Sequence, residues 1–230
     1  MICITGDTHG DISRFKNPVL KKLRKLDSFI IFGDFGFLWN GDKNERKILK
    51  WIGKRKYNVL FAEGLHENFD ELEKYETEYW CGGLTRKISG NLRQLINGQV
   101  YELSGCRIFV FGGGVNDDLD FNAAHATQKI QEREAPDDDE FIQQIKPLGD
   151  NGNKVDFIVT YEPPATITEF IDIGKTDRNK INTFLDRVRA TTEFRMWYFG
   201  RHHVNKIIPP KFRALFDDVV VAEDSVYKDR

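Results

Sequence analysis

Four of the five histidines in this 230-residue chain occur just after short apolar runs, and two aspartates occupy similar positions. These residues are Asp7 and His9, Asp34, His66, and the adjacent pair His202 and His203. Imidazole nitrogens and carboxylate oxygens bind transition metals and also transfer protons. Singly, an aspartate beside a glycine is ordinary turn chemistry, and a histidine after a strand is ordinarily a hydrogen-bonded surface residue. Their recurrence at the ends of successive runs predicts one shared site.

The apolar runs are typical of strands buried on both faces, because they are continuous, short and rich in Ile, Val and Phe. They span Ile2–Thr5, Ser28–Phe32, Asn58–Ala62, Arg107–Phe111, Asp156–Thr160 and Met196–Phe199. Mixed-charge segments with helical spacing lie between several of them, at Ser13–Lys25, Asp42–Lys56, Phe69–Tyr75 and Asp177–Ala190. The alternation predicts an α/β protein with a largely buried sheet. In open α/β sheets ligands gather at the carboxyl ends of the strands, where these polar residues fall.

Two regions depart from this alternation. The final stretch, Lys206–Glu223, is broken by Pro209-Pro210 and Asp217-Asp218, which predicts short strands in hairpins on a second sheet. The stretch Gly112–Asn153 is polar and acidic with weak periodicity, which predicts a surface insertion. Since the chain shows no internal repeat and no interdomain linker, we expect a single domain over residues 1–230.

Charge and composition disfavour several classes of protein. The chain has 34 Lys and Arg against 36 Asp and Glu, a formal net charge of -2, which does not favour binding to nucleic acid. Three cysteines, Cys3, Cys81 and Cys106, are scattered singly, which indicates a reducing compartment and not a disulfide framework. The sequence shows no signal-peptide pattern and no apolar run near the roughly 20 residues of a membrane span. We therefore expect a cytoplasmic protein that does not act on membranes.

Five sequence blocks, taken in order, resemble the calcineurin-like metallophosphoesterase family. They are GDTHG (Gly6–Gly10), GDFG (Gly33–Gly36), GLHEN (Gly64–Asn68), VTYEPP (Val159–Pro164) and FGRHHVN (Phe199–Asn205). The resemblance spans nearly the whole chain. It implies a four-layer αββα sandwich, with two mixed β-sheets flanked by helices and two metal ions held at the strand ends.

The resemblance implies a complete first metal site. The D-x-H pair of the family matches Asp7 and His9, its bridging aspartate matches Asp34, and the last histidine of its G-H-x-H block matches His203. Two carboxylates and two imidazoles suit Zn, Fe or Mn, which accept mixed nitrogen and oxygen ligands. The histidine of the G-N-H-E block, the family's proton donor to the leaving group, matches His66.

The second metal site implied by the family is degenerate in this chain. The asparagine of G-N-H-E is replaced by Leu65, the histidine of T-H-x-P-P by Tyr161, and the first histidine of G-H-x-H by Arg201. Leucine has no donor atom, arginine has no lone pair, and a neutral tyrosine with an ordinary pKa of about 10 is a poor ligand. We therefore expect one tightly bound divalent ion and no second ion.

A permanent cation in a metal site requires an explanation. Arg201 could replace part of the missing ion's charge, by pairing with Asp34 or by a bidentate contact with a phosphate. Alternatively, Arg201 extends into solvent and the second site has simply decayed.

These residues predict a metal-dependent phosphoester hydrolase, a phosphatase or phosphodiesterase of reduced or specialised activity, with His66 and Arg201 as its catalytic residues. A single ion can still acidify a water and polarise a phosphoryl oxygen, but it cannot bridge a nucleophile as two ions do. The substrate would be a phosphorylated small molecule or another phosphoester. The alternative is a catalytically weak or inactive protein of the same fold that binds a phosphorylated ligand or a protein partner.

Overall fold

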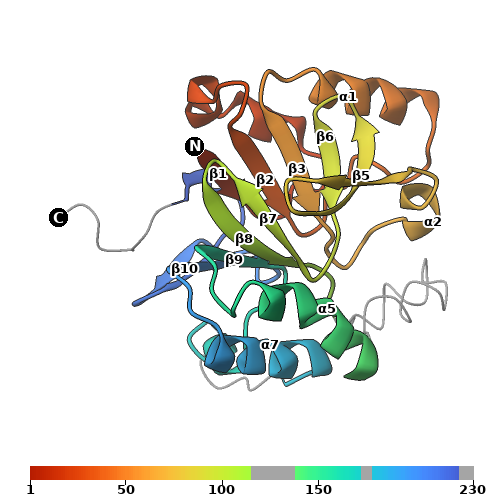
Figure 1. The fold of residues 1–230 in the computed structure, drawn as a ribbon. Coiled ribbons are helices and arrows are strands. Elements are labelled where there is room, and N and C mark those ends of the chain that lie inside the picture. The colour runs from red at the N-terminus through yellow and green to blue at the C-terminus, as the bar shows by residue number, and fades with distance from the viewer. Residues whose placement is uncertain (115–137, 172–177, 223–230) are drawn as a thin grey trace, which may run out of the picture.

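The computed structural model describes residues 1–114, 138–171 and 178–222, and it contains two stacked mixed β-sheets with helices outside them (Figure 1). The strands of the first sheet are β1 (Ile2–Thr5), β2 (Ser28–Phe32), β3 (Asn58–Ala62), β4 (Thr77–Trp80), β5 (Gly83–Ser89), β6 (Leu92–Leu95) and β13 (Val220–Val221). Those of the second are β7 (Gln99–Leu103), β8 (Cys106–Phe111), β9 (Phe157–Thr160), β10 (Met196–Phe199), β11 (Lys206–Ile208) and β12 (Phe212–Ala214). The first sheet has the order β13-β1-β2-β3-β6-β5-β4 and the second β11-β12-β10-β9-β8-β7.

The helices form the two outer layers of the molecule. The α-helices in the described residues are α1 (Lys43–Gly53), α2 (Phe69–Leu72), α5 (Asp138–Asp150), α6 (Ala165–Thr168) and α7 (Lys180–Thr191). Helix α1 covers the first sheet, whereas α5 and α7 cover the second (Figure 1). No helix in residues 1–114, 138–171 or 178–222 is long and apolar enough to cross a bilayer.

The central strands are apolar on both faces because each face packs in a different core. Along β2, Ile30 and Phe32 lie in the core between the two sheets, whereas Phe29 and Ile31 pack in the outer core with Leu49 of α1. A strand buried on both faces needs a continuous apolar sequence, as its residues alternate between the faces. The predicted four-layer αββα sandwich of two mixed β-sheets flanked by helices is confirmed.

The segment predicted as a helix over Ser13–Lys25 instead forms two short 3-10 helices, Ile12–Lys16 and Pro18–Lys22. The physical reason is Pro18, which disfavours helical backbone at the preceding residue. Asn17 accordingly has φ -55° and ψ 130°, and its side chain accepts a hydrogen bond from the backbone N–H of Val19. The sequence pattern predicted helical structure in this segment, but it did not predict the break at Asn17.

The stretch Gly112–Asn153 is not simply a surface insertion. Its described C-terminal part contains α5, and Phe141 and Leu148 of that helix are buried against the second sheet. Residues 115–137 of the predicted insertion lie outside the described residues. Strands β4 to β7 were also not identified from the sequence. Strand β5, for example, alternates between buried and exposed residues, so it lacks the continuous apolar signal of the central strands.

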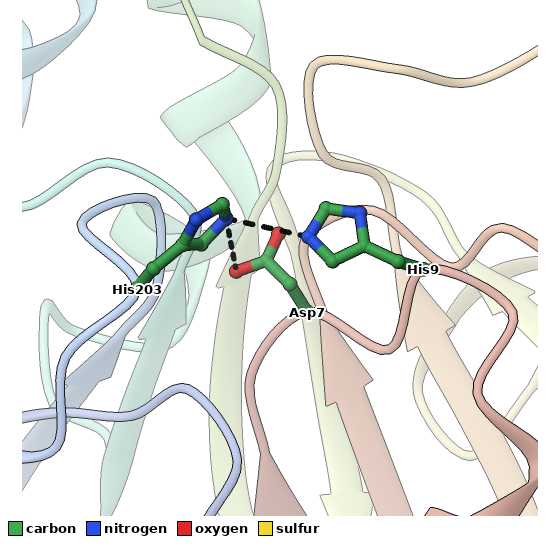
Figure 2. A group of neighbouring side chains, drawn as sticks. All are labelled: Asp7, His9 and His203. Carbon is green, nitrogen blue, oxygen red and sulfur yellow. Dashed lines mark hydrogen bonds and ion pairs between the residues drawn. The ribbon is translucent and has the colours of Figure 1, made fainter.

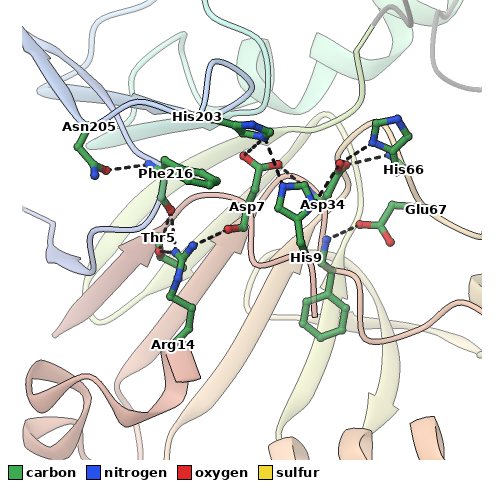
Figure 3. Close-up of polar contacts among 11 residues, drawn as sticks. Thr5, Asp7, His9, Arg14, Asp34, His66, Glu67, His203, Asn205 and Phe216 are labelled. Carbon is green, nitrogen blue, oxygen red and sulfur yellow. Dashed lines mark hydrogen bonds and ion pairs between the residues drawn. The ribbon is translucent and has the colours of Figure 1, made fainter. Parts of the chain in front are cut away.

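The C-terminal stretch joins the two sheets. Strands β11 and β12 form the predicted antiparallel pair on the second sheet. Strand β13, however, pairs antiparallel with β1 at the edge of the first sheet. The chain therefore crosses from one sheet to the other between Ala214 and Val220, and this crossing passes the carboxyl end of β1 (Figure 3).

Candidate metal centre

The predicted site residues follow parallel strands that are neighbours in space. Strands β1, β2 and β3 pair in parallel, in that order, so the loops after them open at one edge of the first sheet. Asp7 and His9 lie in the first loop, Asp34 in the second and His66 in the third. Strand β10 of the second sheet supplies His203, which faces Asp7 and His9 across this edge (Figure 2).

Asp7, His9 and His203 form a group that could hold a metal ion. One ligand atom from each residue lies within 4.8 Å of the other two. The Nε2 atoms of His9 and His203 are 3.3 Å apart, and His203 Nε2 is 4.0 Å from Asp7 Oδ2 (Figure 2). Asp7 is fully buried, whereas the side chains of His9 and His203 are 46% and 49% exposed. The group is therefore closed on the carboxylate side and open to solvent on the imidazole side.

Asp34, the fourth predicted ligand, lies beside this group. Its Oδ2 atom is 3.8 Å from Nδ1 of His9. Both of its carboxylate oxygens contact His66: Oδ1 accepts a hydrogen bond of 2.8 Å from the backbone N–H, and Oδ2 is 2.6 Å from ring atom Nδ1. Asp34 thus connects the predicted proton donor to the metal-ligand group (Figure 3).

The two buried carboxylates fit a cation between them and the histidines. Oδ1 of Asp7 accepts a hydrogen bond from Asp34 N–H, but Oδ2 is buried and accepts no hydrogen bond from any described residue. Burial raises the pKa of Asp7, and the nearby charge of Asp34 raises it further. Burial also acts to raise the pKa of Asp34, but hydrogen bonds from His66 outweigh it and leave this pKa lowered. A carboxylate with an unsatisfied oxygen facing two imidazole nitrogens is a suitable donor set for a divalent transition metal.

Unusual backbone conformations bring these side chains together. Among the non-glycine residues with positive φ are His9 at 44°, Arg201 at 60° and His203 at 49°. Such conformations cost energy and cluster at functional sites. Gly33 has a φ of 98°, and a Cβ atom there would lie 2.5 Å from Asp7 Oδ1. The glycine before Asp34 is therefore required for the close approach of the first two loops.

Residues predicted to replace the ligands of a second ion also lie close together. A Cβ added at Gly114 would lie 3.0 Å from Arg201 Nη1 and 3.2 Å from Leu65 Cδ2, so the Phe111–Gly114 turn closes over this position. Leu65 and Tyr161 are both buried. Burial raises the pKa of Tyr161, and the charges of Asp7 and Asp34 raise it further. The raised pKa keeps the Tyr161 phenol neutral, and a neutral phenol is a poor metal ligand.

Arg201 forms an ion pair with Glu162 through Nη1, and its side chain is 16% exposed, so it does not extend into solvent. Glu162 is buried and also accepts a hydrogen bond of 3.3 Å from Asn179 Nδ2 at the start of α7. Glu162 was not predicted from the sequence. The available signal was an acidic residue two positions after the apolar strand β9, in the VTYEPP block.

The fold is an α/β sandwich with a candidate metal-ligand group at the carboxyl ends of its strands. The family model described as calcineurin-like phosphoesterase matches residues 1–208, and the chain therefore belongs to this family. Membership supports a metal-dependent phosphoester hydrolase. No curated protein matches the sequence. A solved structure of a protein of unknown function, AQ665 from Aquifex aeolicus, shares 14% identity over 84% of this chain and 87% of that one, with a TM-score of 0.35.

Proposed function

We propose that this protein hydrolyses phosphoesters with one divalent ion, Mn, Fe or Zn, held by Asp7, His9, Asp34 and His203. The observation that carries the proposal is the buried Oδ2 atom of Asp7, which accepts no hydrogen bond from the described residues and faces the ring nitrogen of His203. A divalent ion at such a site supplies a Lewis acid that polarises a phosphoryl oxygen and acidifies a water molecule.

His66 is the proposed general acid. Its Nδ1 atom lies 2.6 Å from Asp34 Oδ2, a contact that orients the ring. With Nδ1 directed to Asp34, Nε2 is the ring atom that would donate a proton to the leaving oxygen. A positioned general acid contributes about 10²- to 10⁴-fold in rate.

Arg201 is the proposed phosphate-binding residue. A guanidinium has five N–H donors, so it can contact a carboxylate and a phosphate together. Glu162 and Asn179 hold one edge of this group in place beside Leu65 and Gly114. The substrate class that we propose is a phosphorylated small molecule, because a formal net charge of -2 does not favour binding to nucleic acid. The cytoplasm remains the expected setting.

A second candidate function is binding without turnover. It is favoured by the buried Leu65 and Tyr161 and by the Arg201–Glu162 ion pair, which occupy positions where the family pattern has ligands to a second ion. Such a protein would keep the fold and one ion, and it would use the cleft to hold a phosphorylated ligand or a protein partner.

Metal content and hydrolysis, measured on the same preparations, test the proposal. After purification without chelator and extensive dialysis, we expect about one transition metal per wild-type chain and slow hydrolysis of a chromogenic phosphoester. Asp7→Asn should lose both the metal and the activity. His66→Ala should keep the metal and lose most of the activity.

Two outcomes would contradict parts of this proposal. A wild-type protein that holds one metal but hydrolyses neither monoesters nor diesters would favour the binding function. A metal content near two ions per chain would contradict the single-ion proposal.

A further inference from the structure

We propose that Phe216 is a positioning residue that holds the imidazoles of His9 and His203 in their metal-binding orientation. The inference rests on the metal site of the proposed function, but it concerns a segment outside the family match. That match ends at residue 208, whereas Phe216 lies where the chain crosses from β12 in the second sheet to β13 in the first.

The ring of Phe216 packs against both histidines (Figure 3). Its centroid lies 4.6 Å from that of His203, at an interplanar angle of 31°, and 6.5 Å from that of His9, at 62°. The two imidazoles meet edge to face, with centroids 5.2 Å apart and an angle of 87°. These separations fall within the usual range of aromatic contacts. The three rings therefore form one cluster, in which the Nε2 atoms of His9 and His203 lie 3.3 Å apart.

The two imidazoles need such support because their own surroundings restrict them little. His9 and His203 lie in different loops, with about half of each side chain exposed. An exposed side chain loses rotational entropy when it is fixed, so each ring must be held before binding or ordered at a cost in affinity. A flat ring in contact with both reduces that cost.

Phe216 is in turn tied to the two loops that carry these ligands. Its backbone N–H donates a hydrogen bond of 2.8 Å to Asn205 Oδ1, two residues after His203. Its carbonyl accepts one of 2.7 Å from Arg14 Nη1, and Nη2 of the same guanidinium donates to the carbonyl of Asp7 at 2.9 Å. The guanidinium also lies 5.7 Å from the Phe216 ring centroid. Phe216 therefore connects the Asp7–His9 loop to the His203 loop through both its backbone and its ring.

The test is a Co²⁺ titration of the metal-free full-length protein, followed by visible absorption. Phe216→Leu keeps apolar bulk but removes the flat ring, and we expect about 10- to 100-fold weaker Co²⁺ binding, the usual effect of losing an outer partner of a metal ligand. The ligand-field bands should also shift, because the imidazoles change orientation. Phe216→Tyr should restore both the affinity and the spectrum, since Phe216 is only partly buried and a hydroxyl can reach solvent.

The matched control is Phe212→Leu in the same C-terminal segment. Phe212 packs on Trp197 and Phe194, away from the histidines. We expect this variant to melt at a lower temperature without a change in Co²⁺ affinity or spectrum. Equal loss of affinity in Phe212→Leu would overturn the inference, because it would indicate general destabilisation. So would failure of Phe216→Tyr to recover affinity, or a Phe216→Leu variant that binds like the wild type.

The same experiment separates this inference from the proposed function. If the wild-type protein binds no Co²⁺, the metal centre itself is wrong. If the wild type binds Co²⁺ and Phe216→Leu binds it with the same affinity and spectrum, only the positioning role of Phe216 is wrong. Should Phe216→Leu not fold, Phe216→Met retains a flexible apolar side chain without a ring, and it should show the same loss of affinity and the same spectral change.

Discussion

Among single residues, Arg201 and Glu162 form an ion pair that places a positive and a negative charge beside Leu65 and Gly114. Glu162 is buried, so its carboxylate is stable as a charged group only with close partners, which Arg201 and Asn179 supply. The pairing orients the guanidinium, which has five N–H donors in all.

Replacing Arg201 should therefore weaken phosphate binding. For Arg201→Ala we expect a loss of about 1.5–3 kcal/mol, the range for a hydrogen bond to a charged group. Arg201→Lys should recover part of this loss, because an ammonium keeps the charge but not the planar fork. Calorimetric titration of inorganic phosphate into the metal-loaded protein measures both. Arg55→Ala is the control, since the Arg55 guanidinium lies over the ring of Trp51 in α1 and not at the candidate site.

The opposite outcome would identify the arginine as a mark of decay. In that case Arg201→Ala would leave phosphate affinity unchanged. The triple variant Leu65→Asn, Tyr161→His and Arg201→His would meanwhile gain a second ion per chain. Elemental analysis of the triple variant, together with phosphate titration of Arg201→Ala, distinguishes replacement of the missing ion's charge from decay of the second site.

Glu67 gives a residue-scale prediction about pH. Burial raises its pKa well above the ordinary value, and the charge of Asp34 adds to the effect. A raised carboxyl pKa means that the folded protein binds a proton that the unfolded chain releases, so stability falls as pH rises above the ordinary glutamate pKa of about 4.3. Relative to Glu67→Gln, the wild type should lose about 1.4 kcal/mol per pH unit above that point, up to the folded-state pKa. Urea unfolding of both proteins at several pH values measures the difference, and parallel pH curves would contradict the raised pKa.

At the scale of elements, the first turn of α7 connects helix stability to the site. Asn179 caps this helix, since its side chain accepts from Asn182 N–H, and it also donates to Glu162. Asp42 caps α1 through the N–H groups of Asn44 and Glu45, on the other outer layer.

The two caps should behave differently when they are removed. Asn179→Ala and Asp42→Ala should each lower the free energy of unfolding by about 1 kcal/mol, the usual effect of losing a cap. Only Asn179→Ala should also weaken phosphate binding, because it removes a support of the Arg201–Glu162 pair. Denaturant unfolding and phosphate titration separate the two effects. Equal phosphate affinities in the two variants would show that α7 does not support the site.

At the scale of the whole molecule, the metal-ligand group joins the two sheets. Asp7 and His9 follow β1 of the first sheet, whereas His203 follows β10 of the second. An ion bound by all three must be released when the sheets separate, so metal binding and global unfolding are linked.

Metal should accordingly stabilise the folded protein. At a free Mn²⁺ concentration 100 times the dissociation constant, the free energy of unfolding should rise by about 2.7 kcal/mol. For a chain of this size each kcal/mol corresponds to roughly 2–4 °C in melting temperature. Thermal melts with added Mn²⁺ and with a chelator measure the shift, and Asp7→Asn should show none. A wild-type melting temperature that ignores metal would contradict the ligand group.

The edge of the sheet at which the candidate residues collect was predictable from the sequence. Continuous apolar runs of four to six residues specify central strands, because only a strand buried on both faces needs them. Polar residues directly after such strands must collect at one edge if the strands are parallel, as β1, β2 and β3 are. Local pattern therefore predicted that Asp7, His9, Asp34 and His66 lie together, whereas the choice of His203 as a candidate ligand came from the family resemblance.

The partners of these residues were not predictable from the sequence. Glu162 beside Arg201, and Phe216 beside His9 and His203, are contacts between segments far apart in the chain. Their geometry depends on how the two sheets stack and on the crossing of the C-terminal segment to β13. Local sequence pattern indicates burial and turns. It does not indicate how the loops are placed relative to one another, because packing in the cores beneath them sets that placement. For that reason the members of the candidate ligand group were predictable from the sequence, whereas their neighbours Glu162 and Phe216 were not.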